Sequence, residues 1–227
     1  MSYTLIDHNE DFVVVNKAPG ITIPRDLESM GLLEKVATDL NLDKLFPVHR
    51  LDKATSGLVI LARTTMANQA LSKIFAERRI QKYYLAISDH KPKRKQGLIQ
   101  GDMEKSRRGS WKITKSRNNP AITQMFSLSL APGLRLFLLK PKTGKTHQLR
   151  VALKSIAAPI LGDLRYGSAT QAVDRMYLHA WQLQFNWKGE HKRYAAMPTQ
   201  GALFTDQGFS DSLAPWRSPE ELPWPST

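Results

Sequence analysis

The sequence contains no cysteine, which excludes disulfide bonds and thiolate metal sites. It has no apolar run approaching the roughly 18 residues that a membrane-spanning helix needs. The N-terminal stretch MSYTLIDHNEDFVVVNK carries acidic side chains and has no positively charged region ahead of a long apolar segment, so it does not resemble a secretory signal. These absences predict a cytoplasmic protein that does not enter a membrane.

Negative charge is also scarce, since 20 aspartates and glutamates stand against 33 lysines and arginines and leave a net charge of +13. Such an excess favours a polyanionic partner, most often nucleic acid, because each neutralised phosphate releases counterions. The alternative is a solvated basic surface without a specific partner. In other respects, a hydrophobic share of 41% over 227 residues is typical of a globular protein with a sizeable core.

The positive charge is concentrated in residues 91–117, which hold ten lysines and arginines but only two carboxylates, Asp102 and Glu104. We expect this basic segment to be an insertion that contacts the phosphates of a nucleic acid. The alternative is a flexible, solvated loop. The residues expected to bind phosphate are Lys93, Arg94, Lys95, Arg107 and Arg108.

Apolar patterning predicts an α+β fold. Adjacent pairs of strands with helices between them indicate a single domain over residues 1–227, with a largely antiparallel mixed sheet flanked by helices. Four prolines in residues 214–227 predict an extended tail. The expected strands are 11–20, 57–63, 82–88, 121–130, 134–142, 176–187 and 192–197, and the expected helices are 65–79 and 147–157.

Three familiar kinds of site are absent from the sequence. The segment TGKTH ends like a phosphate-binding loop, but Leu139 stands where that motif needs glycine. None of the six histidines pairs with another at the spacing of a metal site, so we expect no metal. Ser56 lacks the glycine pattern of a hydrolase nucleophile.

The stretch HRLDKATSGLVIL, residues 49–61, places Asp52 between Arg50 and Lys53, ahead of a Ser-Gly turn and an apolar run. An aspartate beside a strand is often only a cap for a turn. Here the turn leads into a buried strand, which would hold the carboxylate rigidly at the end of a sheet. An active-site carboxylate requires such a mount.

The segment HRLDKATSGLVILA resembles the signature of the RluA-type pseudouridine synthases, which isomerise uridine in RNA to pseudouridine. Three further segments match that family in the same order: KYYLA at 82–86, KTGKTHQLRVAL with PILGDLRYG at 142–167, and YLHAWQLQF at 177–185. The resemblance implies the pseudouridine synthase fold, a ribosomal or transfer RNA substrate and a monomeric enzyme. It also implies no cofactor, because the isomerisation involves no net oxidation and no external donor.

The resemblance assigns roles to four residues. Asp52 is the catalytic carboxylate, which either attacks ribose C1′ or removes a ribose proton, and the sequence leaves both routes open. Arg150 pairs with Asp52 and keeps it ionised by lowering its pKa. Tyr84 lies against the uracil and assists loss of the C5 proton. Arg50 fills the base stack vacated by the flipped uridine.

Further residues near these motifs are expected to bind RNA: His49, Lys53, Thr55, Lys145 and Thr146. Lys145 departs from the family, which usually has arginine there and so gains a bidentate fork. Val151-Ala152 likewise replaces the commoner Val-His. The sequence starts directly in the catalytic fold, without the small S4-type domain of many relatives, so we expect residues 91–117 to supply RNA affinity.

Two other functional classes remain as alternatives. A nucleoside N-glycosylase also begins its chemistry at C1′, but the recognised motifs supply no second carboxylate beside Asp52. A non-catalytic RNA-binding module of the same fold is expected to have lost Asp52, Tyr84 or Arg150, and all three are present. The choice between ribosomal and transfer RNA stays open, because such enzymes recognise RNA largely by shape.

Overall fold

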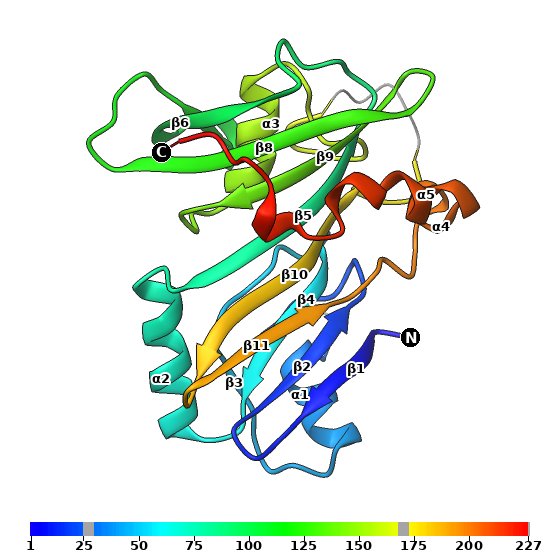
Figure 1. Ribbon diagram of the computed structural model, residues 1–227. Coiled ribbons are helices and arrows are strands. Elements are labelled where there is room, and N and C mark those ends of the chain that lie inside the picture. The colour runs from blue at the N-terminus through cyan, green and yellow to red at the C-terminus, as the bar shows by residue number, and fades with distance from the viewer. Residues whose placement is uncertain (25–29, 168–172, 227) are drawn as a thin grey trace. The chain divides into compact units, whose positions relative to one another are not determined.

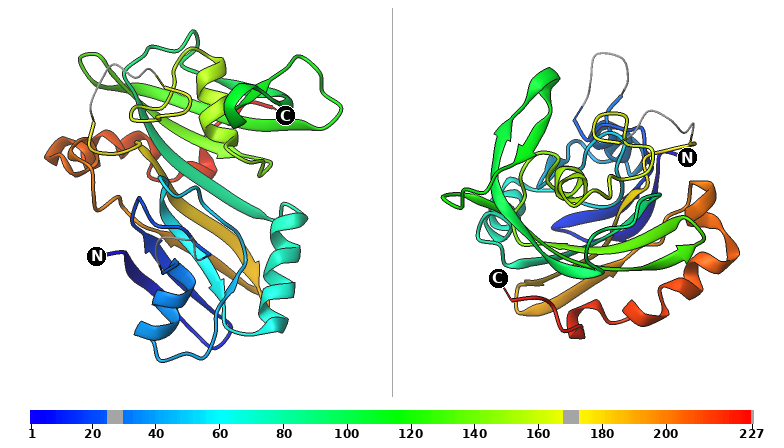
Figure 2. Two further views of the ribbon diagram at one scale, coloured as in Figure 1. Left: turned by 180° about the vertical axis from the view of Figure 1, so that it is seen from behind. Right: turned by 90° about the horizontal axis from the view of Figure 1, so that it is seen from above.

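A computed structural model describes residues 1–24, 30–167 and 173–226. The chain forms two compact units, and Figures 1 and 2 show the course of their elements. Unit 1 consists of Met1–Lys82 and His179–Gln200, and unit 2 consists of Tyr83–Leu178 and Gly201–Thr227. The chain passes from unit 1 to unit 2 within strand β5 (Ile80–Ser88) and returns at the start of β10 (Leu178–Trp187).

Unit 1 is built on a mixed sheet. Its neighbouring strands run antiparallel, except that β4 and β10 run parallel where Ser56 pairs with His179. Further strands lie on both sides of this central pair. In order across the sheet the strands are β1 (Tyr3–His8), β2 (Phe12–Lys17), β4 (Ser56–Ala62) and β10, with β3 (Phe46–Pro47) beside β4 and β11 (Glu190–Ala195) beside β10.

The core of unit 1 forms because β2 and β4 are buried throughout and carry continuous apolar runs, Phe12–Val15 in β2 and Leu58–Ala62 in β4. Helix α2 (Thr65–Ala76) contributes Leu71 and Ile74 to this core. Thr64 caps the start of α2, since its hydroxyl accepts a hydrogen bond from the Ala67 amide at 3.1 Å. A second helix, α1 (Leu32–Asp39), also buries its apolar face.

Unit 2 is built on an antiparallel sheet, whose neighbouring strands all run in opposite directions. In order across the sheet the strands are β5, β9 (Leu134–Pro141), β8 (Pro120–Ala131), β6 (Gln96–Lys105) and β7 (Trp111–Ile113). The helical elements are η1 (Arg107–Gly109), α3 (Gln148–Ser155), α4 (Ala202–Thr205), α5 (Gln207–Ser212), η2 (Ala214–Trp216) and η3 (Pro219–Glu221). No helix in the described part of the chain is long and apolar enough to cross a membrane.

The predicted α+β fold with a largely antiparallel mixed sheet is confirmed. Residues 91–117 do not form the flexible, solvated loop that was the alternative to an RNA-contacting insertion. They form β6 and β7, and β6 pairs with β8 from Gln96 opposite Phe126 to Asp102 opposite Pro120. The apolar pattern missed β6 because Ile99 is its one buried large apolar side chain.

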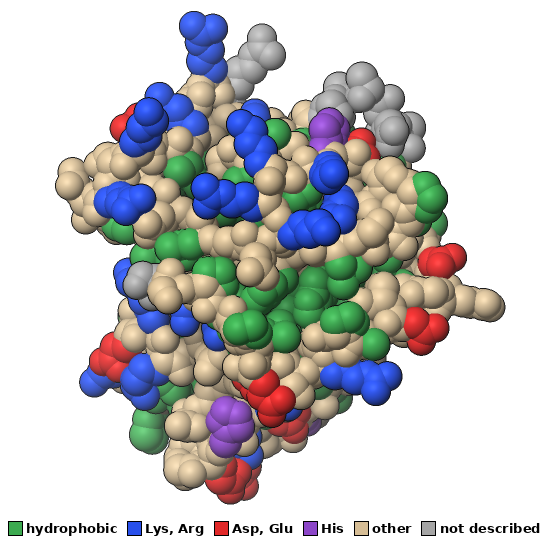
Figure 3. Space-filling view, turned by 45° about the horizontal axis from the view of Figure 1, so that its top comes forward, with side chains coloured by type: hydrophobic (Ala, Val, Ile, Leu, Met, Phe, Trp, Pro, Cys, Tyr) green, Lys and Arg blue, Asp and Glu red, His purple; other side chains and the backbone are tan. Residues whose placement is uncertain are grey.

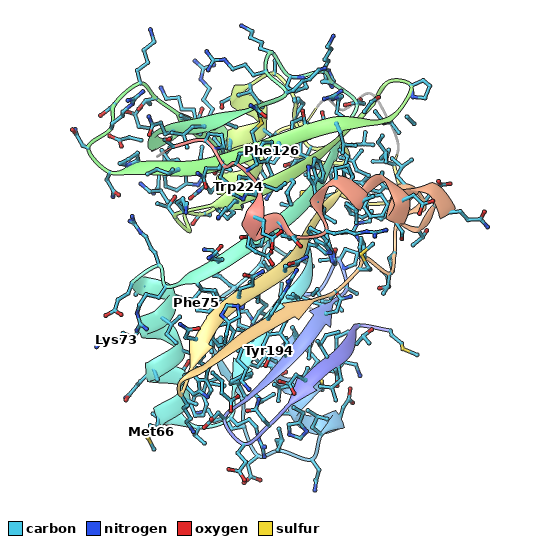
Figure 4. The ribbon with its side chains drawn as sticks, in the orientation of Figure 1. Met66, Lys73, Phe75, Phe126, Tyr194 and Trp224 are labelled. Carbon is cyan, nitrogen blue, oxygen red and sulfur yellow. The ribbon has the colours of Figure 1, made fainter. Side chains whose placement is uncertain are left out.

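The prediction of an extended tail over residues 214–227 is wrong in part. Two short 3-10 turns form there, and each has a proline in its first positions, where the missing amide costs nothing. Trp216 is buried, and the ring of Trp224 lies 4.8 Å from that of Phe126, as Figure 4 shows. The prolines therefore begin short turns, and Trp216 and Trp224 of this segment pack against the protein.

Candidate active site

Asp52 lies half-buried in the loop that leads into β4, and hydrogen bonds hold the loop backbone at Asp52 and at the next residue. The Thr55 amide donates to the Asp52 carbonyl at 2.9 Å. The next carbonyl, that of Lys53, accepts from the Gly20 amide at 2.8 Å and from Lys17 Nζ at 3.2 Å. The backbone that carries Asp52 is thus fixed at this point of the loop.

Lys17, at the end of β2, is fully buried. Its ammonium donates to the carbonyls of Ala18 at 2.9 Å and Ile21 at 2.8 Å, besides that of Lys53. A buried charge is costly unless its hydrogen-bonding capacity is used, and an ammonium has three protons to donate. Lys17 therefore ties three stretches of backbone together next to Asp52. Sequence analysis missed this role, although a lysine ending a buried strand was a visible signal.

A second anchor fixes the start of β4. The Nε2 atom of His179 lies 2.8 Å from the Ala196 carbonyl, which can only accept, so Nε2 carries the imidazole proton. The other nitrogen, Nδ1, then accepts from the Ser56 hydroxyl at 2.8 Å. Beside it, a Cβ on Gly57 would stand 2.3 Å from the Ala180 carbonyl oxygen, so only glycine fits this approach.

His49 has a structural role in unit 1, and its predicted part in RNA binding stays a prediction. Its Nε2 accepts a hydrogen bond from the Ile60 amide at 3.0 Å. Its ring stacks on Phe75 of α2, labelled in Figure 4, at 4.4 Å between centroids. Burial, followed by the charge of Lys82, lowers the pKa of His49 to about 3. A neutral imidazole does not supply positive charge to a phosphate, so any contact of His49 with RNA would be that of a neutral ring.

The other residues predicted to bind RNA around Asp52 divide by exposure. Thr55 is buried, with 2% of its surface exposed, so its hydroxyl is not presented to a substrate in solution. Arg50 and Lys53 are both exposed. The structure therefore retains the two cations as candidate RNA contacts and places Thr55 within the fold.

Arg150, on α3 of unit 2, is held by a carboxylate of the same unit. Its Nε donates to Oδ2 of Asp163 and its Nη2 donates to Oδ1, each at 2.8 Å. Both side chains are largely or fully buried. Such a two-point ion pair fixes the plane of the guanidinium as well as its position.

Asp163 is itself oriented by the loop in which it lies. Its Oδ1 also accepts from the amides of Arg165 at 2.9 Å and Tyr166 at 3.1 Å. Burial opposes ionisation of Asp163, but the hydrogen bonds and charge of Arg150, together with these two amides, outweigh burial and lower the pKa of the carboxyl. Sequence analysis did not single out Asp163, although it lies within the motif segment PILGDLRYG.

The loop before α3 is fixed by the amide side chain of Gln148. Its Oε1 accepts from the Thr143 hydroxyl at 2.7 Å and from the Lys145 amide at 3.0 Å. Lys145 is half-buried and its ammonium donates to the Asn119 carbonyl, whereas Thr146 is exposed. Of these two residues predicted to bind RNA, Thr146 is the more exposed to solvent.

Tyr84 is half-buried in β5 and lies opposite Leu139 of β9. Its neighbour Tyr83 is fully buried, with its ring 6.0 Å from that of Trp224. Successive side chains of a strand point to opposite faces of the sheet. Tyr84 therefore projects from the face opposite the one covered by the C-terminal tryptophan.

The basic segment presents its cations to solvent. Its β6 end is held by Asp102, whose carboxylate accepts from the Ser116 hydroxyl at 2.6 Å and the Asn119 amide at 2.8 Å. Figure 3 shows lysine and arginine side chains gathered on the part of the surface that unit 2 presents in that view. The exposed cations of the segment are Lys91, Lys93, Arg94, Lys95, Lys105, Arg107, Lys112, Lys115 and Arg117.

The three predicted catalytic residues are distributed over both units. Asp52 belongs to unit 1, and Tyr84 and Arg150 belong to unit 2. Contacts inside unit 1 hold the loop of Asp52, and Asp163 holds Arg150 inside unit 2. Their assignment to a common reaction stays a prediction from the family resemblance.

Comparison with known sequences identifies the family. A family model described as RNA pseudouridylate synthase matches residues 11–155. An uncharacterized RNA pseudouridine synthase of Haemophilus influenzae is 51% identical over 90% of this chain and 91% of its own length. Ribosomal large subunit pseudouridine synthase D of Borreliella burgdorferi is 32% identical over 92% of this chain and 70% of its own. The dual-specificity RNA pseudouridine synthase RluA of Salmonella typhi is 33% identical over 79% of this chain and 84% of its own.

Solved structures agree with these matches. Human RNA pseudouridylate synthase domain containing 1 has a TM-score of 0.72 at 26% identity, covering 86% of this chain and 82% of that one. Human RNA pseudouridylate synthase domain containing 4 has a TM-score of 0.72 at 25% identity, covering 92% and 91%. The chain therefore belongs to the RNA pseudouridylate synthase family and is an isomerase that converts uridine in RNA to pseudouridine.

Proposed function

We propose that this isomerase modifies uridine in large-subunit ribosomal RNA, with Asp52 as its catalytic carboxylate. The observation that carries the assignment of Asp52 is its mount, a loop fixed by the buried ammonium of Lys17 through the Lys53 carbonyl. The choice of RNA is supported by relatives named ribosomal large subunit pseudouridine synthase D, from Borreliella burgdorferi, and C, from Rickettsia bellii.

The isomerisation exchanges one bond of ribose C1′ for another. The bond from C1′ to uracil N1 breaks, the base turns, and a bond from C1′ to C5 forms. A proton leaves C5 and N1 takes one up, so atoms and charge balance without a further reactant. An ionised Asp52 either attacks C1′ or removes a ribose proton, and both routes require the anion.

Arg150 and Tyr84 assist in different ways. By the family resemblance Arg150 is the partner of Asp52, and its own orientation is set by Asp163. Tyr84 lies against the uracil and helps the C5 proton to leave. Both are held in unit 2 by contacts that do not depend on substrate.

Recognition requires the target uridine to leave the RNA stack, because its C1′ and C5 are not accessible inside structured RNA. Arg50, which is exposed, fills the space that the base vacates. The exposed cations of β6, β7 and the loops beside them grip the flanking phosphates, and each neutralised phosphate adds to the salt dependence of binding. Chemistry and affinity are thus assigned to different residues.

The proposal is tested by mapping pseudouridine in total RNA from cells with and without the gene. We expect one or more positions in large-subunit ribosomal RNA to lose the modification in cells without the gene. The wild-type gene should restore these positions, and a gene encoding Asp52→Asn should not. Loss confined to transfer RNA would contradict the proposed target, and restoration by Asp52→Asn would contradict the catalytic assignment.

A further inference from the structure

Lys82, at the start of β5, is a half-buried lysine at the edge of the core of unit 1. Because side chains alternate along a strand, Lys82 projects from the same face of β5 as Ile80. Ile80 belongs to the buried core cluster of unit 1, against which Phe75 of α2 packs. Burial, followed by the charge of Arg78, lowers the pKa of Lys82. Keeping an ammonium here is therefore costly, and within the described residues no carboxylate pairs with it.

His49 presents an N–H donor beside this ammonium. Its Nε2 accepts from the Ile60 amide at 3.0 Å, so the neutral imidazole carries its proton on Nδ1. The charge of Lys82 contributes to the lowered pKa of His49, which places the ammonium close to the ring. The ring is half-buried, and among the residues that the structure describes none accepts from Nδ1.

Arg78 adds a second cation at the turn between α2 and β5, which Figure 1 shows leading from one to the other. Its φ of 58° is left-handed, and its amide donates to the Phe75 carbonyl at 3.1 Å. The adjacent carboxylate, Glu77, is already engaged, since it lies 2.7 Å from Nε of Arg79 and 3.8 Å from Nζ of Lys73. Arg78 is exposed, and no carboxylate in the described ranges pairs with it.

The cluster of these three side chains, Lys82, His49 and Arg78, offers donors only. An ammonium has three protons to donate, a guanidinium has five and this imidazole has one. An anion with several acceptor oxygens would satisfy them and offset the cost of the half-buried charge. The substrate of this isomerase carries such an anion at every nucleotide, because each phosphodiester of RNA has a negative charge and two free oxygens.

The cluster also lies close to the predicted catalytic residue along the chain. His49 precedes Asp52 by three residues, so their backbones are at most about 11 Å apart. A phosphate bound by the cluster would thus belong to the target nucleotide or to one beside it.

We propose that Lys82, His49 and Arg78 form a binding site for one backbone phosphate of the substrate RNA, at or next to the target uridine. The inference rests on the proposed function in one respect, because it takes Asp52 to react with that uridine. Sequence analysis assigned no role to Lys82 or Arg78. Their role differs from that of the basic segment, because a single phosphate fixed near Asp52 sets the register of the RNA.

The first test measures binding to an RNA fragment around the uridine that pseudouridine mapping identifies, in ribosomal or transfer RNA. Lys82→Met keeps an apolar stem and removes the charge. We expect its Kd to rise about tenfold and its salt slope to fall by about 0.7. Arg79→Gln is the matched control, because it removes a nearby charge that Glu77 already pairs with. Its Kd should stay within about twofold, and an equal rise in both variants would overturn the site.

The second test locates the phosphate with neutral methylphosphonate linkages, introduced one at a time around the uridine. One linkage should weaken binding to wild type about tenfold. The same linkage should change the Kd of Lys82→Met less than about twofold, because the contact is already missing. Equal weakening of both proteins at that linkage would overturn the contact, and so would the absence of any sensitive linkage.

The third test separates this role from a merely structural one. Lys82→Met should keep or raise the Tm, because it removes a half-buried charge that lacks a carboxylate partner; a lower Tm would overturn the proposal. In NMR of lysines labelled with carbon-13, with Lys82→Met identifying the signal, RNA should raise the pKa of Lys82. An unchanged pKa would overturn it too.

Failure of the proposed function gives a different result from failure of this site. If the mapped uridine lies in transfer RNA, the proposed target is wrong. If Asp52→Asn stays active, the catalytic assignment is wrong. In both cases the three tests still run on the mapped fragment, and Lys82→Met binding like wild type would overturn the phosphate site alone.

Discussion

Arg150 and Asp163 form a two-point ion pair, in which Nε and Nη2 of the arginine each lie 2.8 Å from a different oxygen of the carboxylate. A guanidinium has five N–H protons, and Asp163 takes two of them. The pair lies wholly within unit 2. Arg150 is therefore oriented before any substrate binds, and the resemblance to the family adds a second predicted partner, Asp52.

Removing the charge of Asp163 should destabilise the protein. Asp163→Asn leaves the buried guanidinium of Arg150 without its counter-charge, so we expect a loss of roughly 3 kcal/mol in the free energy of unfolding. Urea denaturation followed by circular dichroism measures the loss. Glu190→Gln is the control, because the side chain of Glu190 is exposed in its pair with Lys192, and exposed ion pairs contribute little to stability. Equal losses in the two variants would contradict the prediction.

The same pair determines a response to acid. Since the pKa of Asp163 is lowered in the folded protein from its ordinary value of 3.8, its contribution is fully present above that value and disappears as the pH falls below it. Asp163→Asn should therefore lack this part of the acid sensitivity. Unfolding curves from pH 6 down to about pH 3 test it, and parallel curves for both proteins would argue against ionisation of Asp163.

Asp52→Asn should abolish isomerisation. The amide keeps the shape of the side chain but cannot act as an anion, so RNA binding should stay within about tenfold of wild type. Single-turnover assays on large-subunit ribosomal RNA measure the rate, and filter binding measures the affinity. Residual activity above a few per cent of wild type would remove Asp52 from the catalytic role.

The basic segment should control affinity and leave the chemistry unchanged. Replacing Lys93, Arg94, Lys95, Arg107 and Arg108 together by glutamine should weaken RNA binding. It should also flatten the salt dependence by about 0.7 to 0.9 for each phosphate contact that is lost. The single-turnover rate at saturating RNA should hardly change, because Asp52, Tyr84 and Arg150 are untouched.

An equal change of charge in unit 1 provides the control for the basic segment. The control variant replaces five exposed or partly exposed lysines of unit 1 by glutamine: Lys35, Lys44, Lys73, Lys188 and Lys192. If both variants reduce the salt slope equally, the effect is one of net charge. If the saturated rate collapses in the first variant, the segment belongs to the reaction itself.

His49 should stay neutral at physiological pH. Its pKa of about 3 lies below the ordinary value of 6.5, so the unfolded chain binds a proton at this residue that the folded protein does not. Stability from this source is present above pH 6.5 and falls as the pH decreases towards 3. Between pH 7 and pH 5 we expect wild type to lose about 2 kcal/mol more than His49→Gln. Identical losses in urea denaturation would show that His49 titrates normally.

The sequence by itself determined the features that depend on neighbouring residues. The apolar runs at 57–63 and 134–142 predicted β4 and β9, because a buried strand needs a continuous stretch of apolar side chains. The helix at 65–79 followed from its spacing and ends three residues earlier in the structure, at Ala76. Asp52 is predicted as the catalytic carboxylate for the same reason, since its motif is contiguous and local sequence is enough to recognise it.

Tertiary structure alone decided which side chains meet across the chain. Lys17 and the Lys53 carbonyl are far apart in sequence, as are His179 and Ser56, and Tyr166 and Trp111. Adjacent residues can also have opposite environments. His49 contacts Ile60 and Phe75, whereas Arg50 is exposed. Strand β6 required its partner β8, since its own side chains carry too little apolar character to indicate a strand. Hydrogen bonds and burial depend on which residues lie close together in space. The sequence shows directly only which residues are neighbours along the chain.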